Sequence, residues 1–171
     1  MALTYSGMCA LILSSVNTYR NHPEVCPVAD CNLALNRLVR GFCEQMGRDQ
    51  RGRRYSTMAA REANQGCIKD HIVPIRVIQQ KLLSLPIEEL EVCNSNLNTL
   101  EEYLARSLVT CRVTYGENLT LGQRYQSCMP EGYEVLGSPF QDDEWARYKA
   151  TDLYASVGDL GSDFSSRIAA G

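Results

Sequence analysis

The amino-acid sequence predicts an α+β protein that is mainly helical, folds as a single domain and contains a small antiparallel pair of strands. Length supports one domain, because a chain of 171 residues can bury about 70% of its unfolded surface. Apolar residues recur at helical spacing in several segments, most clearly between Val28 and Met46. Strands are favoured at residues 67–74, where β-branched residues precede a proline, and at 109–115, where apolar and polar residues alternate.

The remaining elements follow from periodicity and from residues that start or stop helices. Pro27 suits the first turn of the helix that begins at Val28, and Ser56 is the expected N-cap of a short helix that Gly66 ends. A turn at 129–132 and a small strand at 133–136 are expected before a last helix capped by Asp142 or Asp143. In chain order, the expected helices cover residues 1–16, 28–46, 57–65, 75–85, 90–108 with a break near 94–96, 117–128 and the segment around Trp145.

The predicted domain spans residues 1–157. Its parts are N-terminal helices at 1–47, a core at 55–137 and a C-terminal helix at 138–157, followed by a flexible tail at 158–171. No stretch approaches 18 apolar residues, so no membrane is expected as a partner. The first segment is interpreted as a helix rather than a secretory signal, because no basic residue precedes Arg20.

Eight cysteines admit two interpretations. In a short secreted chain they would form disulfides, but here five of them fall on the apolar stripes of predicted elements, where a thiol behaves as a small hydrophobe. These are Cys9, Cys31, Cys43, Cys93 and Cys111. We therefore expect reduced cysteines and a cytoplasmic, intracellular protein.

Basic residues gather in one part of a chain whose net charge is −3. Because local potential matters more than net charge, such a cluster can still bind phosphate, and DNA is the partner it suggests. A solvated loop is the alternative interpretation. The cluster contains Arg48, Arg51, Arg53, Arg54, Arg61, Lys69 and Arg76.

The segment from Lys69 to Pro74, Lys-Asp-His-Ile-Val-Pro, contains the most specific chemistry. Neighbouring side chains on a strand point to opposite sides, so Asp70 can hold a divalent cation while His71 reaches a water molecule. In phosphodiester hydrolysis the cation stabilises the developing charge, and the histidine takes a proton from the attacking water. A surface strand end, in which the aspartate fixes the imidazole, is the alternative.

This segment resembles the core of HNH (His-Me finger) endonucleases and of small phage-encoded HNH-like proteins. The resemblance implies that His71 is the general base and Asp70 a metal ligand, at the start of a ββα unit that the strand at 109–115 and the following helix complete. Glu117 and Asn118 begin that helix and are the candidates for the remaining metal ligands. A catalytic site would require a divalent metal (Mg, Mn, Ni or Zn), and a non-catalytic protein would need no cofactor.

Three functions stay open at this point. The first is a metal-dependent HNH-type endonuclease that hydrolyses DNA. The second is a non-catalytic phage-type inhibitor on a degenerate HNH-like scaffold, acting as an anti-defence protein on a host defence protein in the host cytoplasm. The third is a small helical protein-interaction module, for which residues 67–74 should not pair with residues 109–115.

Overall fold

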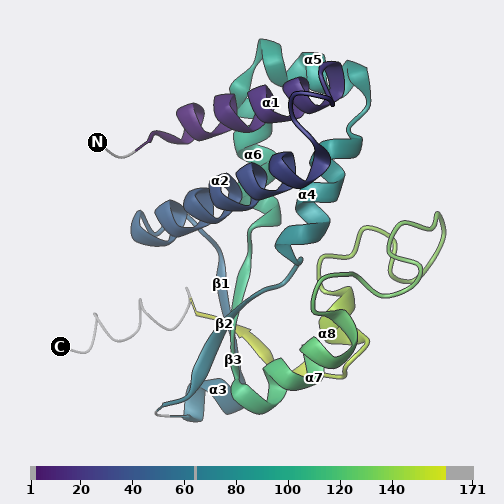
Figure 1. Cartoon of the computed structure of the whole chain (residues 1–171). Coiled ribbons are helices and arrows are strands. Elements are labelled where there is room, and N and C mark those ends of the chain that lie inside the picture. The colour runs from purple at the N-terminus through teal and green to yellow at the C-terminus, as the bar shows by residue number, and fades with distance from the viewer. Residues whose placement is uncertain (1–2, 64, 161–171) are drawn as a thin grey trace. The chain divides into compact units, whose positions relative to one another are not determined.

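The computed structural model describes residues 3–63 and 65–160, which form two units (Figure 1). Unit 1 contains the described residues up to Arg51 together with Ile75–Ser107. Unit 2 contains Gly52–Pro74 together with the described residues from Leu108 onwards. The chain therefore passes from unit 1 into unit 2 and back before it completes unit 2. The α+β class predicted from the sequence is confirmed, and the single-domain assignment stays a prediction.

Unit 1 is helical. The Thr4 hydroxyl caps its first helix by accepting a hydrogen bond from the Gly7 N–H at 3.0 Å, and Pro27 precedes the second as expected. Helices α1 and α2 pack on each other, α1 also packs on α6, and α2 on α4. The predicted break near residues 94–96 is confirmed, since Asn96 separates two helices. The helices of unit 1 are α1 (Tyr5–Asn21), α2 (Val28–Arg48), α4 (Ile75–Ser84), α5 (Ile87–Ser95) and α6 (Leu97–Ser107).

Unit 2 is built on a sheet with the strand order β2-β3-β1-β4. The predicted antiparallel pair is confirmed, because β2 pairs with β3 and places Asp70 opposite Cys111. The third function, the helical interaction module, required these two segments not to pair, and that requirement is not met. Two strands that the sequence did not predict extend this pair, since β1 pairs parallel with β3 and antiparallel with β4 in the described part of the chain. The strands are β1 (Arg54–Thr57), β2 (Cys67–His71), β3 (Thr110–Thr114) and β4 (Val157–Asp159).

Three local predictions in unit 2 need correction. Ser56 is part of β1 because its backbone pairs with both neighbouring strands, and Thr57 caps α3 (Met58–Glu62) in its place. Residues 133–136 form turns rather than a strand. Helix α8 (Ala146–Lys149) is a single turn with Trp145 as its N-cap, while the Asp143 carboxylate accepts the Trp145 N–H at 3.0 Å.

The segment expected as a flexible tail begins inside the sheet. Gly158 pairs with Ser56, and Asp159 pairs with Tyr55, after a 3₁₀ turn at Tyr154–Ser156. Residues 161–171 of that segment lie outside the described residues. Three residues of β4 pair with three of β1, and this pairing supplies hydrogen-bond partners to the backbone of β1 on that side.

The core of unit 2 lies on one face of the sheet, against α7 (Tyr115–Tyr125) and α8. A capping box fixes the start of α7: the Thr114 hydroxyl accepts the Glu117 N–H, and the Glu117 carboxylate accepts the Thr114 N–H. The Tyr55 and Trp145 rings meet edge to face at 4.9 Å. The fully or nearly buried members of this core are Ile72, Val109, Cys111, Val113, Leu121, Trp145 and Tyr148.

All eight cysteines are free thiols. The five predicted to lie in the interior are buried, which confirms their role as small apolar side chains. No helix in the described ranges is long and apolar enough to cross a membrane.

Leu121→Ala should lower the free energy of unfolding by about 2–5 kcal/mol, because it leaves a cavity under α7. Leu119→Ala on the same helix is the matched control, since Leu119 is 46% exposed and its truncation should change stability by less than about 0.5 kcal/mol. Urea titrations followed by the fluorescence of the single tryptophan, Trp145, measure both. Equal midpoints for the two variants would show that α7 does not pack on the sheet as described.

Candidate functional site

Asp70 lies on β2 with its side chain on the core face of the sheet, where only 14% of the side chain is exposed. Two groups approach the same carboxylate oxygen, Oδ2. The Tyr148 hydroxyl donates a hydrogen bond at 2.8 Å, and Nη1 of Arg147 lies at 3.5 Å. A carboxylate in an apolar core is therefore held by one cation and one hydroxyl.

Arg147 connects α8 to the end of β2. Its side chain is 3% exposed, and Nη1 also donates to the carbonyl oxygens of His71 at 2.8 Å and Ile72 at 3.4 Å. Within the described residues, Nε of Arg147 is buried and has no hydrogen-bond partner. The guanidinium thus binds the end of β2 through Nη1, while its buried Nε–H has no acceptor among the described residues.

The pKa values of these groups follow from burial and from their mutual charges. Burial raises the pKa of the Asp70 carboxyl above its usual range, and the charge of Arg147 and the hydrogen bond from Tyr148 offset only part of that effect. Burial and then the charge of Asp70 raise the pKa of the Tyr148 hydroxyl, which keeps it a hydrogen-bond donor. Burial raises the pKa of the neighbouring Cys111 thiol to about 12, so this thiol is not a nucleophile at neutral pH.

Glu117, a predicted metal ligand, lies on the same face of the sheet but is engaged in local structure. Its Oε2 accepts hydrogen bonds from the Thr57 hydroxyl at 2.8 Å, the Thr114 N–H at 2.7 Å and the Thr114 hydroxyl at 2.9 Å. These bonds stabilise the start of α7 and tie it to β1. Asn118, the other candidate on α7, is half-buried in its first turn.

The predicted ligands do not form a set suited to a divalent cation. The hydrogen bonds to Asp70 Oδ2 and Glu117 Oε2 compete with a cation for the same oxygens. Among residues 3–63 and 65–160, no group of three or more histidine, cysteine, aspartate and glutamate side chains could hold a metal ion. The assignment of Asp70, Glu117 and Asn118 as metal ligands stays a prediction.

His71 lies on the face of the sheet opposite to Asp70, because successive side chains of a strand alternate. It pairs with Thr110 at the end of β2, is half-buried, and its carbonyl oxygen accepts the hydrogen bond from Arg147. The side chain of His71, the predicted base, and that of Asp70, the predicted metal ligand, therefore lie on opposite sides of β2.

The second face of the sheet carries a row of exposed cations. Lys69 on β2 lies directly opposite Arg112 on β3, and Arg54 on β1 lies opposite Thr110 on β3. A methyl group placed on Gly158 of β4 would overlap the Arg61 guanidinium, which places Arg61 over the same face. We call this surface the basic face; it consists of Arg54, Arg61, Lys69 and Arg112.

Hydrogen bonds to backbone carbonyls help to position two of these cations. Arg61 Nη2 donates to the Asp159 carbonyl at 2.9 Å, and Arg112 Nη2 donates to the Ala63 carbonyl at 3.3 Å. These contacts orient the two guanidinium groups, each of which carries five N–H donors. Both side chains remain exposed to solvent.

The other predicted nucleic-acid contacts are divided between the units. Arg53 belongs to unit 2, where it pairs with Glu144 at 3.7 Å. Arg48, Arg51 and Arg76 belong to unit 1, and Arg51 pairs there with Glu101 at 3.4 Å. The basic residues that form one cluster in the sequence are thus divided between the two units.

Three residues that matter in this region were not predicted as site residues: Arg112, Arg147 and Tyr148. Arg112 was detectable, because it lies on the polar side of an alternating strand predicted to pair with the strand that holds Lys69. Arg147 is flanked by Trp145 and Tyr148 in a segment that gives no sign of its distant partner. A buried arginine paired 77 positions away in the sequence leaves no local pattern.

Arg147→Met should lower the free energy of unfolding by about 3–5 kcal/mol near neutral pH, because it leaves a buried carboxylate unpaired. Unfolded Asp70 titrates at about 3.9. Because the pKa of Asp70 is raised in the folded state, folded protein binds more protons than unfolded protein at pH values between the unfolded and the folded pKa. Ionisation of Asp70 therefore lowers the free energy of unfolding as pH rises through that range. Removing Arg147 raises the folded-state pKa of Asp70 further. The loss of stability in Arg147→Met should therefore become smaller as pH falls, because Asp70 is then protonated and uncharged.

Urea midpoints measured from about pH 7 down to about pH 5 check this pH dependence. Lys149→Met is the control, since the Lys149 side chain is 41% exposed, and an ion pair made by an exposed lysine contributes about 0–1 kcal/mol. A deficit for Arg147→Met that is small, or that grows on acidification, would be inconsistent with a buried pair between Arg147 and Asp70.

Comparison with known proteins gave no relative: no protein-family model, no curated protein and no solved structure matches the chain.

Proposed function

We propose that unit 2 is a non-catalytic nucleic-acid-binding module on an HNH-like ββα scaffold, and that the basic face contacts the phosphate backbone. The observation that carries the proposal is the direct opposition of Lys69 and Arg112 on neighbouring strands. Like charges directly opposite each other destabilise a sheet, and burial of apolar surface does not account for either side chain, since both are exposed. A phosphate between them would turn the repulsion into binding energy.

The chemistry of the basic face suits phosphate groups rather than a specific base sequence. Arginine forks and a lysine ammonium hydrogen-bond phosphate oxygens strongly, and such contacts fix a duplex without reading its bases. Arg54, Lys69 and Arg112 project from three adjacent strands of the sheet, and Arg61 lies over the fourth. Neighbouring strands lie about 4.8 Å apart, so the cations can meet successive phosphates of one strand.

The opposite face of β2 supports the non-catalytic part of the proposal. Asp70 is the residue that the HNH resemblance assigns to the metal, yet its Oδ2 is engaged by Tyr148 and Arg147. Freeing it would leave a buried guanidinium without its counter-charge. A cytoplasmic location suits this function, because nucleic acid is accessible there and free thiols are stable in a reducing compartment.

An HNH-type endonuclease is the second candidate, favoured by one observation. The order of β2, β3 and α7, with β2 antiparallel to β3, follows the ββα unit that the resemblance implies. In that case His71 would act as the base on the basic face, where phosphates are proposed to bind. The two candidates differ in whether bound DNA is cut.

Lys69→Glu should weaken binding to duplex DNA roughly tenfold at low salt, because it removes one charge-assisted contact and adds a repulsion. The slope of log affinity against log salt should also fall by about 1. The same change places opposite charges on facing residues, so the unfolding midpoint should stay equal or rise. Fluorescence anisotropy of a labelled duplex and urea titration measure these effects.

Arg124→Glu is the matched control, because it makes a similar charge change at an exposed position on α7, away from the basic face. It should bind DNA nearly as tightly as the unmodified protein. If Arg124→Glu and Lys69→Glu weaken binding equally, net charge rather than the basic face accounts for the interaction, and the proposal is wrong.

A plasmid-nicking assay separates the two candidates. With Mg²⁺, Mn²⁺, Ni²⁺ or Zn²⁺ added in turn, the proposed binding module should bind plasmid DNA and leave it supercoiled. Metal-dependent nicking that His71→Ala abolishes would instead establish the endonuclease. Nicking that persists in His71→Ala would identify a contaminating nuclease.

A further inference from the structure

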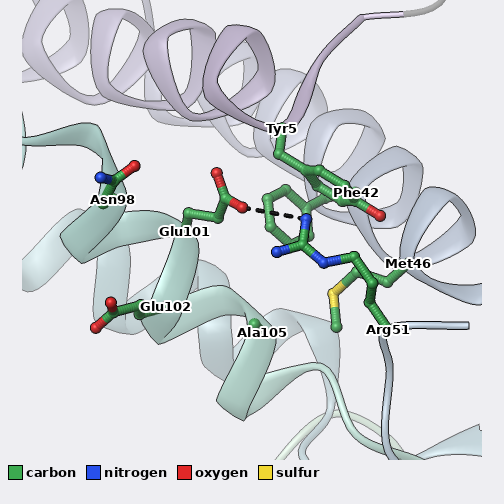
Figure 2. A pocket seen from close by; sticks show the side chains of 8 residues that line it. All are labelled: Tyr5, Phe42, Met46, Arg51, Asn98, Glu101, Glu102 and Ala105. Atoms are coloured by element: carbon green, nitrogen blue, oxygen red, sulfur yellow. Dashed lines mark hydrogen bonds and ion pairs between the residues drawn. The ribbon is translucent and has the colours of Figure 1, made fainter. Parts of the chain in front are cut away.

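A hollow of about 270 Å³ lies inside unit 1 (Figure 2). It is independent of the basic face, because every residue that lines it belongs to unit 1. The start of α1, the second half of α2, the segment after α2 and one side of α6 contribute to it. The lining residues are Tyr5, Phe42, Met46, Arg51, Asn98, Glu101, Glu102 and Ala105.

One side of the hollow is aromatic and apolar. Phe42 and Met46 of α2 are buried, and the Tyr5 ring meets the Phe42 ring at 4.9 Å with an interplanar angle of 64°. The Tyr5 hydroxyl donates to the Asp49 carboxylate at 2.7 Å, which fixes the ring in place. Burial, followed by the hydrogen bond to Asp49, raises the pKa of Tyr5 to about 12, so the ring stays neutral. A neutral aromatic face beside carboxylates attracts cations.

The other side of the hollow is acidic and comes from α6. Figure 2 shows the Glu101 carboxylate turned towards the aromatic side, while Glu102 and Asn98 point away from it. Glu101 is only 20% exposed, so its charge is poorly screened by water. Glu101 is thus the carboxylate that faces the aromatic side, and Arg51 is the cation that pairs with it there.

Arg51 supplies a cation to this hollow from the chain itself. Its Cζ lies 4.7 Å from the centroid of the Tyr5 ring, and its Nη1 lies 3.4 Å from Glu101 Oε1. The side chain is nevertheless 57% exposed and belongs to a segment outside any helix. A single long ion pair and one exposed cation–π contact hold it weakly, so another cation can exchange with it.

We propose that this hollow binds an alkylguanidinium, the group at the end of an arginine side chain, and that Arg51 occupies the site when no ligand is bound. The incoming guanidinium takes over the two contacts that Arg51 makes, with the face of Tyr5 and with Glu101. The alkyl chain lies along Phe42 and Met46, which suits a ligand whose charge follows an apolar stem. The volume of the hollow is sufficient for one such side chain.

The test uses the full-length protein and two probes, Nα-acetylarginine amide and its uncharged analogue Nα-acetylcitrulline amide. Arg51→Ala vacates the site, and its affinity for the arginine probe should exceed that of the unmodified protein roughly fivefold, because an internal competitor is removed. The double variant Arg51→Ala/Glu101→Gln should lose that gain. Shifts of the Ala105 amide resonance in NMR titrations report binding at the hollow.

Arg51→Ala/Glu91→Gln is the matched control, since Glu91 is an exposed glutamate of α5 that does not line the hollow. It should bind as Arg51→Ala does. The proposal is overturned if both probes bind equally, if Arg51→Ala binds no tighter than the unmodified protein, or if Glu101→Gln leaves binding intact. Thermal unfolding of each variant confirms that the helices remain folded.

Discussion

The ion pair between Arg147 and Asp70 is the interaction on which the arrangement of unit 2 depends. It places two charges in an apolar core, where each is tolerated only because the other is present. The same guanidinium holds the carbonyl oxygens at the end of β2, and the adjacent Tyr148 closes the core over Asp70. Helix α8 is a single turn, so these side-chain contacts rather than its own backbone bonds hold it against the sheet.

This pair gives the two faces of the sheet different roles. On the core face, Asp70 and Glu117 accept hydrogen bonds from neighbouring donors, which tie α8 to β2 and fix the start of α7. On the basic face, Lys69 lies directly opposite Arg112, and the repulsion between the two cations lowers stability. A bound polyanion would neutralise this repulsion. Binding and folding are thus separable on one sheet, because alternate residues of β2 point to opposite sides.

The sequence predicted the elements whose periodicity is strong and whose partners are local. The helix at 28–46 and the alternating strand at 109–115 are confirmed, as is the pairing of that strand with residues 67–74. β1 was missed, because Arg54–Thr57 is short and its strand character comes from distant partners on β3 and β4. For the same reason the partners of Asp70 were not predicted: nothing near it in the sequence reveals that Arg147 and Tyr148 approach it.

The most direct measurement is an NMR titration of the isotope-labelled protein with a short DNA duplex at low salt. If the basic face is the binding surface, saturable shifts centre on the amides of Lys69, Arg112, Arg54 and Arg61, while the indole resonance of Trp145 on the core face stays unchanged. Shifts centred on α7 and on Trp145, or the lack of any saturable shift, would contradict the assignment of nucleic-acid binding to that face.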